Sequence, residues 1–273
     1  MNNSSPVISF SAAEAAYLAA LLGAETLVGF PDPFYGWLAE DIRTALLETR
    51  AGLAGRGLVT LGPEGSTAID PAVAPLIRAC GFADASFVLT RTDPAGTTAV
   101  RYYHVAPELT VEHVTPPHSL SAGDLAGVAG TYEVYRRVLA FFRLEGQIAP
   151  AADSGLLPEA LLRRARTLAE SNEGEARAVL LQAGLSTSVA RALAETFLHP
   201  VGNAALVALA RRADAPEVDG VAFLAGANGI WRLRPTSRHG ADWVELSPFT
   251  AAEAESGILR VMNRVLPVPL GVH

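Results

Sequence analysis

Two sets of similar segments in this chain are separated by the same distance along the sequence. Gly57-Leu58 ends one apolar helical stretch, and Gly184-Leu185 ends another, 127 positions later (184 − 57). The pattern Val-x-x-Arg-Val-Leu begins at Val134 and again at Val261, also 127 positions apart (261 − 134). After each Gly-Leu, a helix and a run of strands are predicted before the matching Val-x-x-Arg-Val-Leu helix. The repeat therefore predicts that one α/β unit occurs twice.

This duplication predicts an α/β (α+β) fold built from two pseudo-symmetric halves. Each half has helices, then antiparallel strands, then one closing helix, and the two halves surround a central sheet. We expect residues 1–273 to form a single domain with a first half at 10–145 and a second half at 154–267. The stretch 146–154 between them is rich in Pro, Ala and Gly, which is typical of a linker.

Local signals place the elements of the two halves. Ser11 and Thr250 each precede a glutamate by three positions, which is the capping-box spacing that begins a helix. A wing-like hairpin is expected from residues 56–60 and 67–69, and Ser121 is expected to open a helix. Further strands are expected at 86–91, 97–105, 109–115, 204–211, 221–224, 230–234 and 243–246, and further helices at 37–54, 158–171, 173–183 and 186–198.

The composition limits the classes of partner. The net charge is −7, and every cation is arginine because the sequence contains no lysine. Nucleic-acid binding usually needs a basic surface, so we expect no nucleic-acid partner. Half of the residues are hydrophobic and only 18% are charged, which favours surfaces that a partner covers. The single cysteine, Cys80, follows apolar helix residues and is expected to be a buried thiol.

The sequence contains no segment that predicts a membrane location. No apolar run is long enough to span a bilayer, so we expect no membrane insertion. Residues 1–6 have neither the basic nor the apolar region of a signal peptide. We therefore expect a soluble cytoplasmic protein.

Familiar catalytic motifs are absent from the sequence. A phosphate-binding P-loop requires a lysine, and neither a nucleophile elbow nor a His-Glu-x-x-His helix occurs. His104 and His113 lie on consecutive predicted strands, with Glu112 and His118 nearby. Two imidazoles and a carboxylate can form a metal site, but a partly exposed pair without ligand geometry is the favoured interpretation. We expect no catalytic residue, no metal and no cofactor.

Aromatic and arginine residues in the second half are candidates for a partner-binding surface. Along residues 231–234, Trp and Leu alternate with two Arg, so one face of this strand is apolar and the other cationic. Three aromatics of this region are expected to share one sheet face. Burial in the core is their simpler role, and the alternative is a binding surface, because Trp, Tyr and Arg are frequent in interface hot spots. The predicted partner-binding residues are Phe223, Trp231, Arg232, Arg234 and Trp243.

The layout of these segments resembles that of the ESX secretion-associated EspG family, over about residues 10–266. The resemblance lies in Gly57-Leu58-Val59 after two helices, in Ile69-Asp70-Pro71-Ala72-Val73-Ala74-Pro75-Leu76, and in Trp243-Val244-Glu245-Leu246 before the helix that ends at Leu266. The resemblance implies two related α/β halves around a central sheet and a cytosolic chaperone of type VII secretion. Such a chaperone binds the helical tip of a secreted PPE-type protein and has no catalytic residues. The aromatic loop at 30–37 and the absence of lysine have no match in the family pattern.

These observations support one function hypothesis and leave two alternatives. The hypothesis is a non-enzymatic chaperone or adaptor that covers the exposed apolar helical tip of a secreted partner and keeps that partner soluble. A homodimer is a further possible assembly. The first alternative is a winged-helix DNA-binding regulator, based on the helix–hairpin–helix pattern of residues 38–77. The second is an enzyme with a site near His104 and His113.

Overall fold

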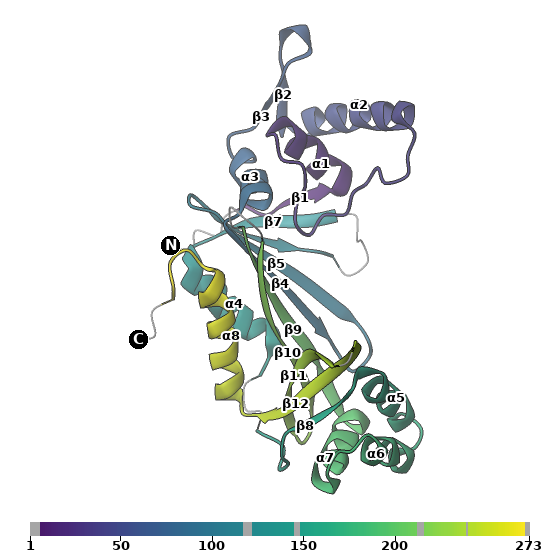
Figure 1. The fold of residues 1–273 in the computed structure, drawn as a ribbon. Helices are drawn as coiled ribbons and strands as arrows, with labels where there is room; N and C mark the ends of the chain where they lie inside the picture. The colour runs from purple at the N-terminus through teal and green to yellow at the C-terminus, as the bar shows by residue number, and fades with distance from the viewer. Residues whose placement is uncertain (1–5, 117–121, 145–147, 212–215, 239, 271–273) are drawn as a thin grey trace.

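The computed structural model describes residues 6–116, 122–144, 148–211, 216–238 and 240–270, and it is dominated by one large antiparallel sheet (Figure 1). The strands are β1 (Ile8–Ser11), β2 (Val59–Leu61), β3 (Thr67–Ile69), β4 (Ala85–Thr92), β5 (Thr98–Val105), β6 (Thr110–Val114), β7 (Ala122–Val128), β8 (Gly155–Pro158), β9 (Pro200–Ala210), β10 (Glu217–Gly226), β11 (Gly229–Arg238) and β12 (Ala241–Phe249). The helices are α1 (Ala12–Leu21), α2 (Ala39–Gly55), α3 (Ala74–Phe82), α4 (Gly130–Phe142), α5 (Glu159–Ala169), α6 (Glu173–Gln182), α7 (Thr187–Leu198) and α8 (Ala251–Val265).

The order of the strands is the same when read outward from the middle of the sheet in either direction. Ten strands follow the order β1-β7-β6-β5-β4-β9-β10-β11-β12-β8, so β4 and β9 meet at the centre. The pairing of β4 with β9 runs from Ala85 opposite Ala210 to Thr92 opposite Asn203. Outward from this pair, each half of the chain adds its next three strands in sequence and then the strand that precedes its helices. The predicted mixed fold around a central antiparallel sheet is confirmed, while the half boundaries at 10–145 and 154–267 stay predictions.

The two Gly-Leu segments of the repeat end their helices with the same hydrogen bonds. Gly57 and Gly184 both adopt left-handed backbone conformations, with φ of 70° and 90°. The Leu58 amide donates to the Leu53 carbonyl at 3.0 Å, and the Leu185 amide donates to the Leu180 carbonyl at 3.3 Å. This is the 6→1 bond of a Schellman cap, and both accepting leucines are fully buried. The repeat thus marks positions where a helix end is fixed against the core.

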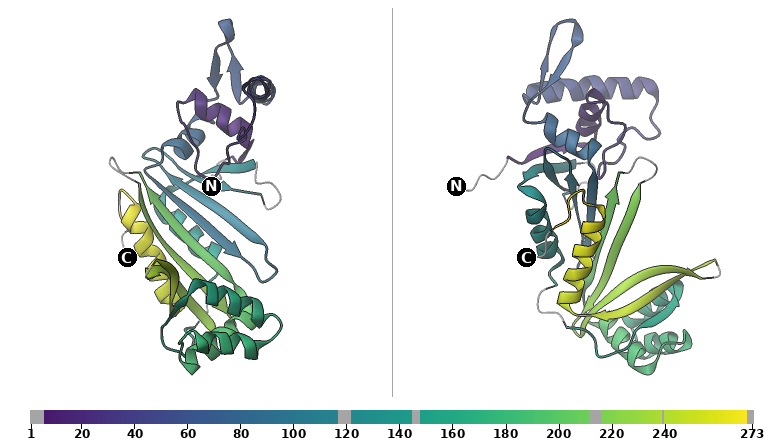
Figure 2. Two further views of the ribbon diagram at one scale, coloured as in Figure 1. Left: turned by 45° about the vertical axis from the view of Figure 1, so that its right-hand side comes forward. Right: turned by 60° about the vertical axis from the view of Figure 1, so that its left-hand side comes forward.

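One face of the sheet, the α4/α8 face, is covered by the two closing helices. Phe87 and Leu206 of the central strands pack there with Val138 of α4 and Met262 of α8 in the largest core cluster. Figure 2 shows α4 and α8 along the same side of the sheet, and the Tyr135 hydroxyl of α4 donates to a Glu255 carboxylate oxygen of α8 at 2.8 Å. Each closing helix therefore covers the strands of its own half.

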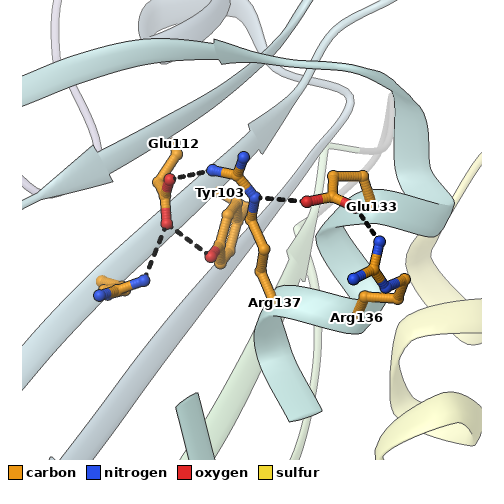
Figure 3. A network of polar contacts seen from close by, with 6 residues as sticks. Tyr103, Glu112, Glu133, Arg136 and Arg137 are labelled. Carbon is orange, nitrogen blue, oxygen red and sulfur yellow. Dashed lines mark hydrogen bonds and ion pairs between the residues drawn. The ribbon is translucent and has the colours of Figure 1, made fainter. Parts of the chain in front are cut away.

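A buried carboxylate fixes α4 on this face (Figure 3). Glu112 of β6 accepts hydrogen bonds from the Tyr103 hydroxyl at 2.7 Å and from Arg101 at 3.1 Å, and it also pairs with Arg137 of α4. Arg137 is held in turn by Glu133, one helical turn earlier, at 2.9 Å. Burial raises the pKa of Tyr103, and the charge of Glu112 raises it further, so this hydroxyl stays protonated and donates.

The opposite face, the bundle face, carries a helical bundle at each end. At one end, α1 and α3 cover Phe10, Val111 and Leu125 of the outer strands. At the other end, α5, α6 and α7 cover Leu224 and Trp231. Figure 1 shows these two bundles at opposite ends of the molecule. The middle of the bundle face lies between them.

The structure contains most of the expected elements. One segment that was expected to be helical is a strand, and two short strands were not expected. Both capping boxes form, at Ser11 and at Thr250, and the wing-like hairpin exists as β2 and β3. The helix expected to begin at Ser121 is wrong, because residues 122–128 form β7 and α4 begins only at Gly130. Asp124 accepts a hydrogen bond from Ser9 of β1 instead of capping a helix. Strands β1 and β8 were not expected, because each has only four residues and is held by its neighbour in the sheet.

We predict that Gly57→Ala and Gly184→Ala each lower the free energy of unfolding by about 1 kcal/mol, because an L-residue is strained at positive φ. A Cβ atom at either position meets nothing within 4 Å, so the cost arises from the backbone alone. Gly52→Ala inside α2 is the control, since it also meets nothing within 4 Å and raises helix propensity by about 0.5 kcal/mol. Urea denaturation of the three variants measures these changes. Neutral effects at Gly57 and Gly184 would contradict the shared cap.

Candidate partner-binding surface

An apolar strip crosses the middle of the bundle face between the two helical bundles. The strip is formed by paired residues of β4, β9 and β10. Val207 of β9 pairs with Val88 of β4 on one side and with Gly220 of β10 on the other, and Leu209 of β9 pairs with Val218 of β10. Val207 is 39% exposed and Val218 is 60% exposed. We call the apolar strip the set of Val88, Ala205, Val207, Leu209, Val218 and Ala222.

The strip is free of charge as well as uncovered. Side chains alternate between the two faces of a strand, so positions 203, 205, 207 and 209 of β9 share the bundle face. None of these four is charged, and the paired positions of β4 and β10 are also uncharged over the strip. A hollow of about 390 Å³ lies at one end, where Ser86 and Leu209 meet Val28 of the loop after α1. Val207 and Val218 are exposed and the other four members of the strip are partly exposed, and a contiguous apolar surface of this kind is a candidate binding site.

The structure separates the residues that were predicted to bind a partner. Phe223 and Trp231 are both buried, and they lie on opposite faces, because Phe223 pairs with Arg232 and Leu224 pairs with Trp231. The Trp231 indole nitrogen donates to the Thr196 hydroxyl of α7 at 3.0 Å. The expectation that Phe223, Trp231 and Trp243 share one face is therefore wrong. The face on which each aromatic lies depends on the register between paired strands, and local sequence does not determine that register.

The remaining three predicted residues lie on the α4/α8 face of β11 and β12. Arg232 lies over the Phe249 ring at 5.6 Å, and Trp243 is covered by Arg238 at 5.8 Å. Arg234 reaches Glu245 at 3.8 Å and is exposed. The alternation of apolar and cationic positions along β11 is confirmed. A binding role for Arg232, Arg234 and Trp243 stays a prediction.

The aromatic loop at 30–37 also lies partly at the surface. Tyr35 is 88% exposed and Trp37 is 52% exposed, while Trp37 packs edge-on against Phe34 at 5.9 Å. Phe30 points inward instead and stacks on His113 at 4.3 Å. The loop therefore combines a partly buried Phe30 with an exposed aromatic tip before α2.

The two histidines on neighbouring strands form a buried stack and not a partly exposed pair. His104 and His113 are both buried, with ring centroids 6.1 Å apart, and Tyr102 stacks on His113 at 4.9 Å. The His104 Nδ1 atom bonds the Ser86 hydroxyl at 3.1 Å, whereas its Nε2 atom and both nitrogens of His113 have no partner among the described residues. Glu112 lies on the opposite face. His118 lies outside the described residues.

Burial keeps both imidazoles neutral. Desolvation, together with a smaller effect of the neighbouring His113, lowers the pKa of His104 to about 3. Desolvation also lowers the pKa of His113 to about 4, although the charge of Asp124 opposes this shift. The described residues include no group of three or more His, Cys, Asp or Glu placed to hold a metal ion. Cys80 is buried as expected, and burial raises the pKa of its thiol.

Comparison with solved structures identifies a similar fold. EspG5, a type VII secretion system chaperone of Mycobacterium tuberculosis solved in complex with the PE25–PPE41 dimer, superimposes with a TM-score of 0.61 at 16% identity, over 97% of this chain and 99% of that chain. The chain has the fold of EspG5. Two structures of HtdX (Rv0241c) from the same organism, at 12% and 13% identity over 88% and 90% of this chain and 98% of theirs, have TM-scores of 0.14 and 0.15. No family model and no curated protein matches the sequence.

The EspG5 fold confirms, at the level of architecture, the resemblance seen in the sequence. None of the described helices is long and apolar enough to cross a membrane. The wing-like hairpin of the DNA-binding alternative has no arginine between residues 59 and 69, and its tip carries Glu64. Since His104 and His113 are buried, the enzyme alternative gains no accessible group from them.

We predict that the histidine stack makes the protein less stable as the pH falls from about 6.5 to 4. Unfolded imidazoles take up protons near pH 6.5, whereas the folded ones do so only near pH 4 and 3, so acid favours the unfolded state. At pH 5 the loss is about 2 kcal/mol for each histidine. Denaturant titrations at pH 7.5 and 5 measure it, and His113→Phe is expected to reduce the difference by about 2 kcal/mol.

Imidazole NMR resonances provide a second measurement of the same property. They are expected to show both rings neutral in the folded protein at pH 5.5. Titration of the His104 or the His113 ring near pH 6.5 would contradict the prediction. An unchanged pH dependence of the unfolding free energy in His113→Phe would also contradict it.

Proposed function

We propose that this protein is a cytoplasmic, non-enzymatic chaperone that binds a secreted helical protein through the apolar strip. The observation that carries the proposal is the uncharged, uncovered strip of Val88, Val207 and Val218 on an otherwise helix-packed sheet. The EspG5 fold supports the chaperone class, because that protein was solved with a PE–PPE dimer. The proposed partner for this chain is a helical secreted protein of the same general kind.

The shape of the bundle face suits the tip of a helical partner. The two bundles rise at the ends of the strip, and the hollow beside Leu209 adds depth at one end. A helical tip bound there contacts positions such as Gly220, which has no side chain, and Ala205, which has a small one. The partner can therefore approach the strand backbone closely at these positions. Apolar burial contributes about 25 cal/mol per Å² removed from water, so affinity arises without nucleotide or metal.

The chaperone effect follows from covering apolar surface on both molecules. A secreted protein with an exposed apolar tip tends to associate with other copies of itself. When the apolar strip of this chain covers that tip, the self-association is prevented. Because the strip itself has no charge, polar contacts that define the partner must come from its margins.

We predict that Val207→Glu and Val218→Glu abolish binding of the partner while leaving the fold intact. Both side chains are already exposed, so the carboxylate is solvated in the free protein but buried without a counter-ion in the complex. Leu47→Glu on α2 is the matched control, because Leu47 is 57% exposed and lies off the strip. Co-expression with a helical secreted PE–PPE dimer, followed by affinity and size-exclusion chromatography, measures the complex.

Three results would refute this proposal. The first is a complex that survives both strip substitutions. The second is loss of the complex with Leu47→Glu as well, which would indicate an unspecific effect of charge. The third is a homodimer of the free protein that Val207→Glu dissociates, since the strip would then be covered by a second copy of the chain.

A further inference from the structure

A cationic cleft lies on the α4/α8 face, beside the C-terminal end of α4. The cleft has a volume of about 370 Å³ and lies between α4 and the hairpin of β4 and β5. Four arginines line it: Arg91 of β4, Arg101 of β5, Arg137 of α4 and Arg143, which caps α4. None of the described residues that line the cleft is acidic.

Two of the four arginines are held in place by the structure. Arg101 and Arg137 share the buried carboxylate of Glu112, and Figure 3 shows Arg137 and Glu112. Glu112 lies between the two guanidinium groups, and Arg137 also pairs with Glu133 at 2.9 Å. Their positions are therefore fixed before any ligand arrives, which lowers the entropy cost of binding.

The other two arginines have no carboxylate partner within ion-pair distance among the described residues. Arg91 donates to the Phe141 carbonyl oxygen at 3.0 Å and lies over the Phe141 ring at 5.6 Å. Burial lowers the pKa of Arg91, and the charge of Arg143 lowers it further, against the opposing charge of Asp93. Like charges thus accumulate here in a protein whose net charge is −7.

The backbone at Arg143 is unusual for the residue it carries. Its φ of 54° and ψ of 46° place it in the left-handed region, where helix ends usually have glycine or asparagine. A non-glycine residue in this region has a conformational free-energy cost. The arginine at this position places a fourth cation at the cleft.

The matching position of the repeat gives a useful comparison. Arg264 lies 127 positions after Arg137 and lines a cleft beside α8 that also holds four arginines. That second cleft contains Asp219 and Glu253 in its lining, and Arg264 pairs with Glu217 and Asp219 at 3.2 and 3.3 Å. The lining of the cleft at α8 therefore contains acidic residues, whereas the lining of the cleft at α4 contains none among the described residues.

We propose that the cleft lined by Arg91, Arg101, Arg137 and Arg143 binds a phosphate-class anion, either free or as the phosphoryl group of a small molecule. Guanidinium groups bind phosphate oxygens through paired N–H donors, and a doubly charged anion compensates the two unpaired arginines. Thr97, Thr98 and Thr115 add hydroxyl groups to the same lining. This site lies on the face opposite the apolar strip and does not depend on the proposed chaperone function.

Isothermal titration calorimetry of the full chain at constant ionic strength tests the site, with pyrophosphate, inorganic phosphate and citrate as probes. We expect one saturable site that binds pyrophosphate more tightly than phosphate or citrate. Arg143→Asn keeps a residue that tolerates the left-handed region and is expected to weaken pyrophosphate binding at least about tenfold, the usual effect of losing one charge-assisted contact. Arg91→Gln is expected to do the same.

Arg43→Gln on the exposed surface of α2 is the matched control, because it changes the net charge equally away from the cleft. It is expected to leave binding unchanged. Absence of saturable binding, equal weakening by Arg43→Gln, or full affinity in a folded Arg143→Asn variant would overturn the proposal. Citrate binding as tight as that of pyrophosphate would overturn the assignment to phosphate. Thermal unfolding of each variant shows whether it is folded.

Discussion

The pairing of β4 with β9 is the contact on which the rest of this structure depends. It joins the strands of the first half to those of the second over the whole length from Ala85 to Thr92. Without it, each half would end in a long strand with unpaired backbone groups, a surface that favours aggregation. With it, ten strands form one sheet, and the two closing helices lie side by side on one face.

The same central strands supply both the core and the candidate binding surface. In β9, Leu206 and Ala208 point into the core under α4 and α8, while Val207 between them points to the bundle face. The helical bundles pack on the outer strands, where Leu125 and Trp231 supply their contacts. The central strands are thus buried on one face and uncovered on the other, although both faces are apolar.

Local chemistry made much of the fold predictable, and non-local pairing limited the rest. The caps at Ser11, Thr250, Gly57 and Gly184 depend on residues within one helical turn, so their sequence signals were sufficient. Strand β7 contains Gly123 and Gly127 and forms only because β6 and β1 pair with it.

The candidate site illustrates the same limit. Phe223 and Trp231 were among the predicted partner-binding residues, although burial in the core was their simpler role, and nothing in the sequence singled out Val207. Only the register of β9, β10 and β11 shows that the aromatic pair is buried and that the valine is exposed. The apolar strip also needs both halves of the chain, since Val88 comes from the first and Val207 from the second. The apolar strip lies where the strands of the two halves meet, so neither half alone can form it.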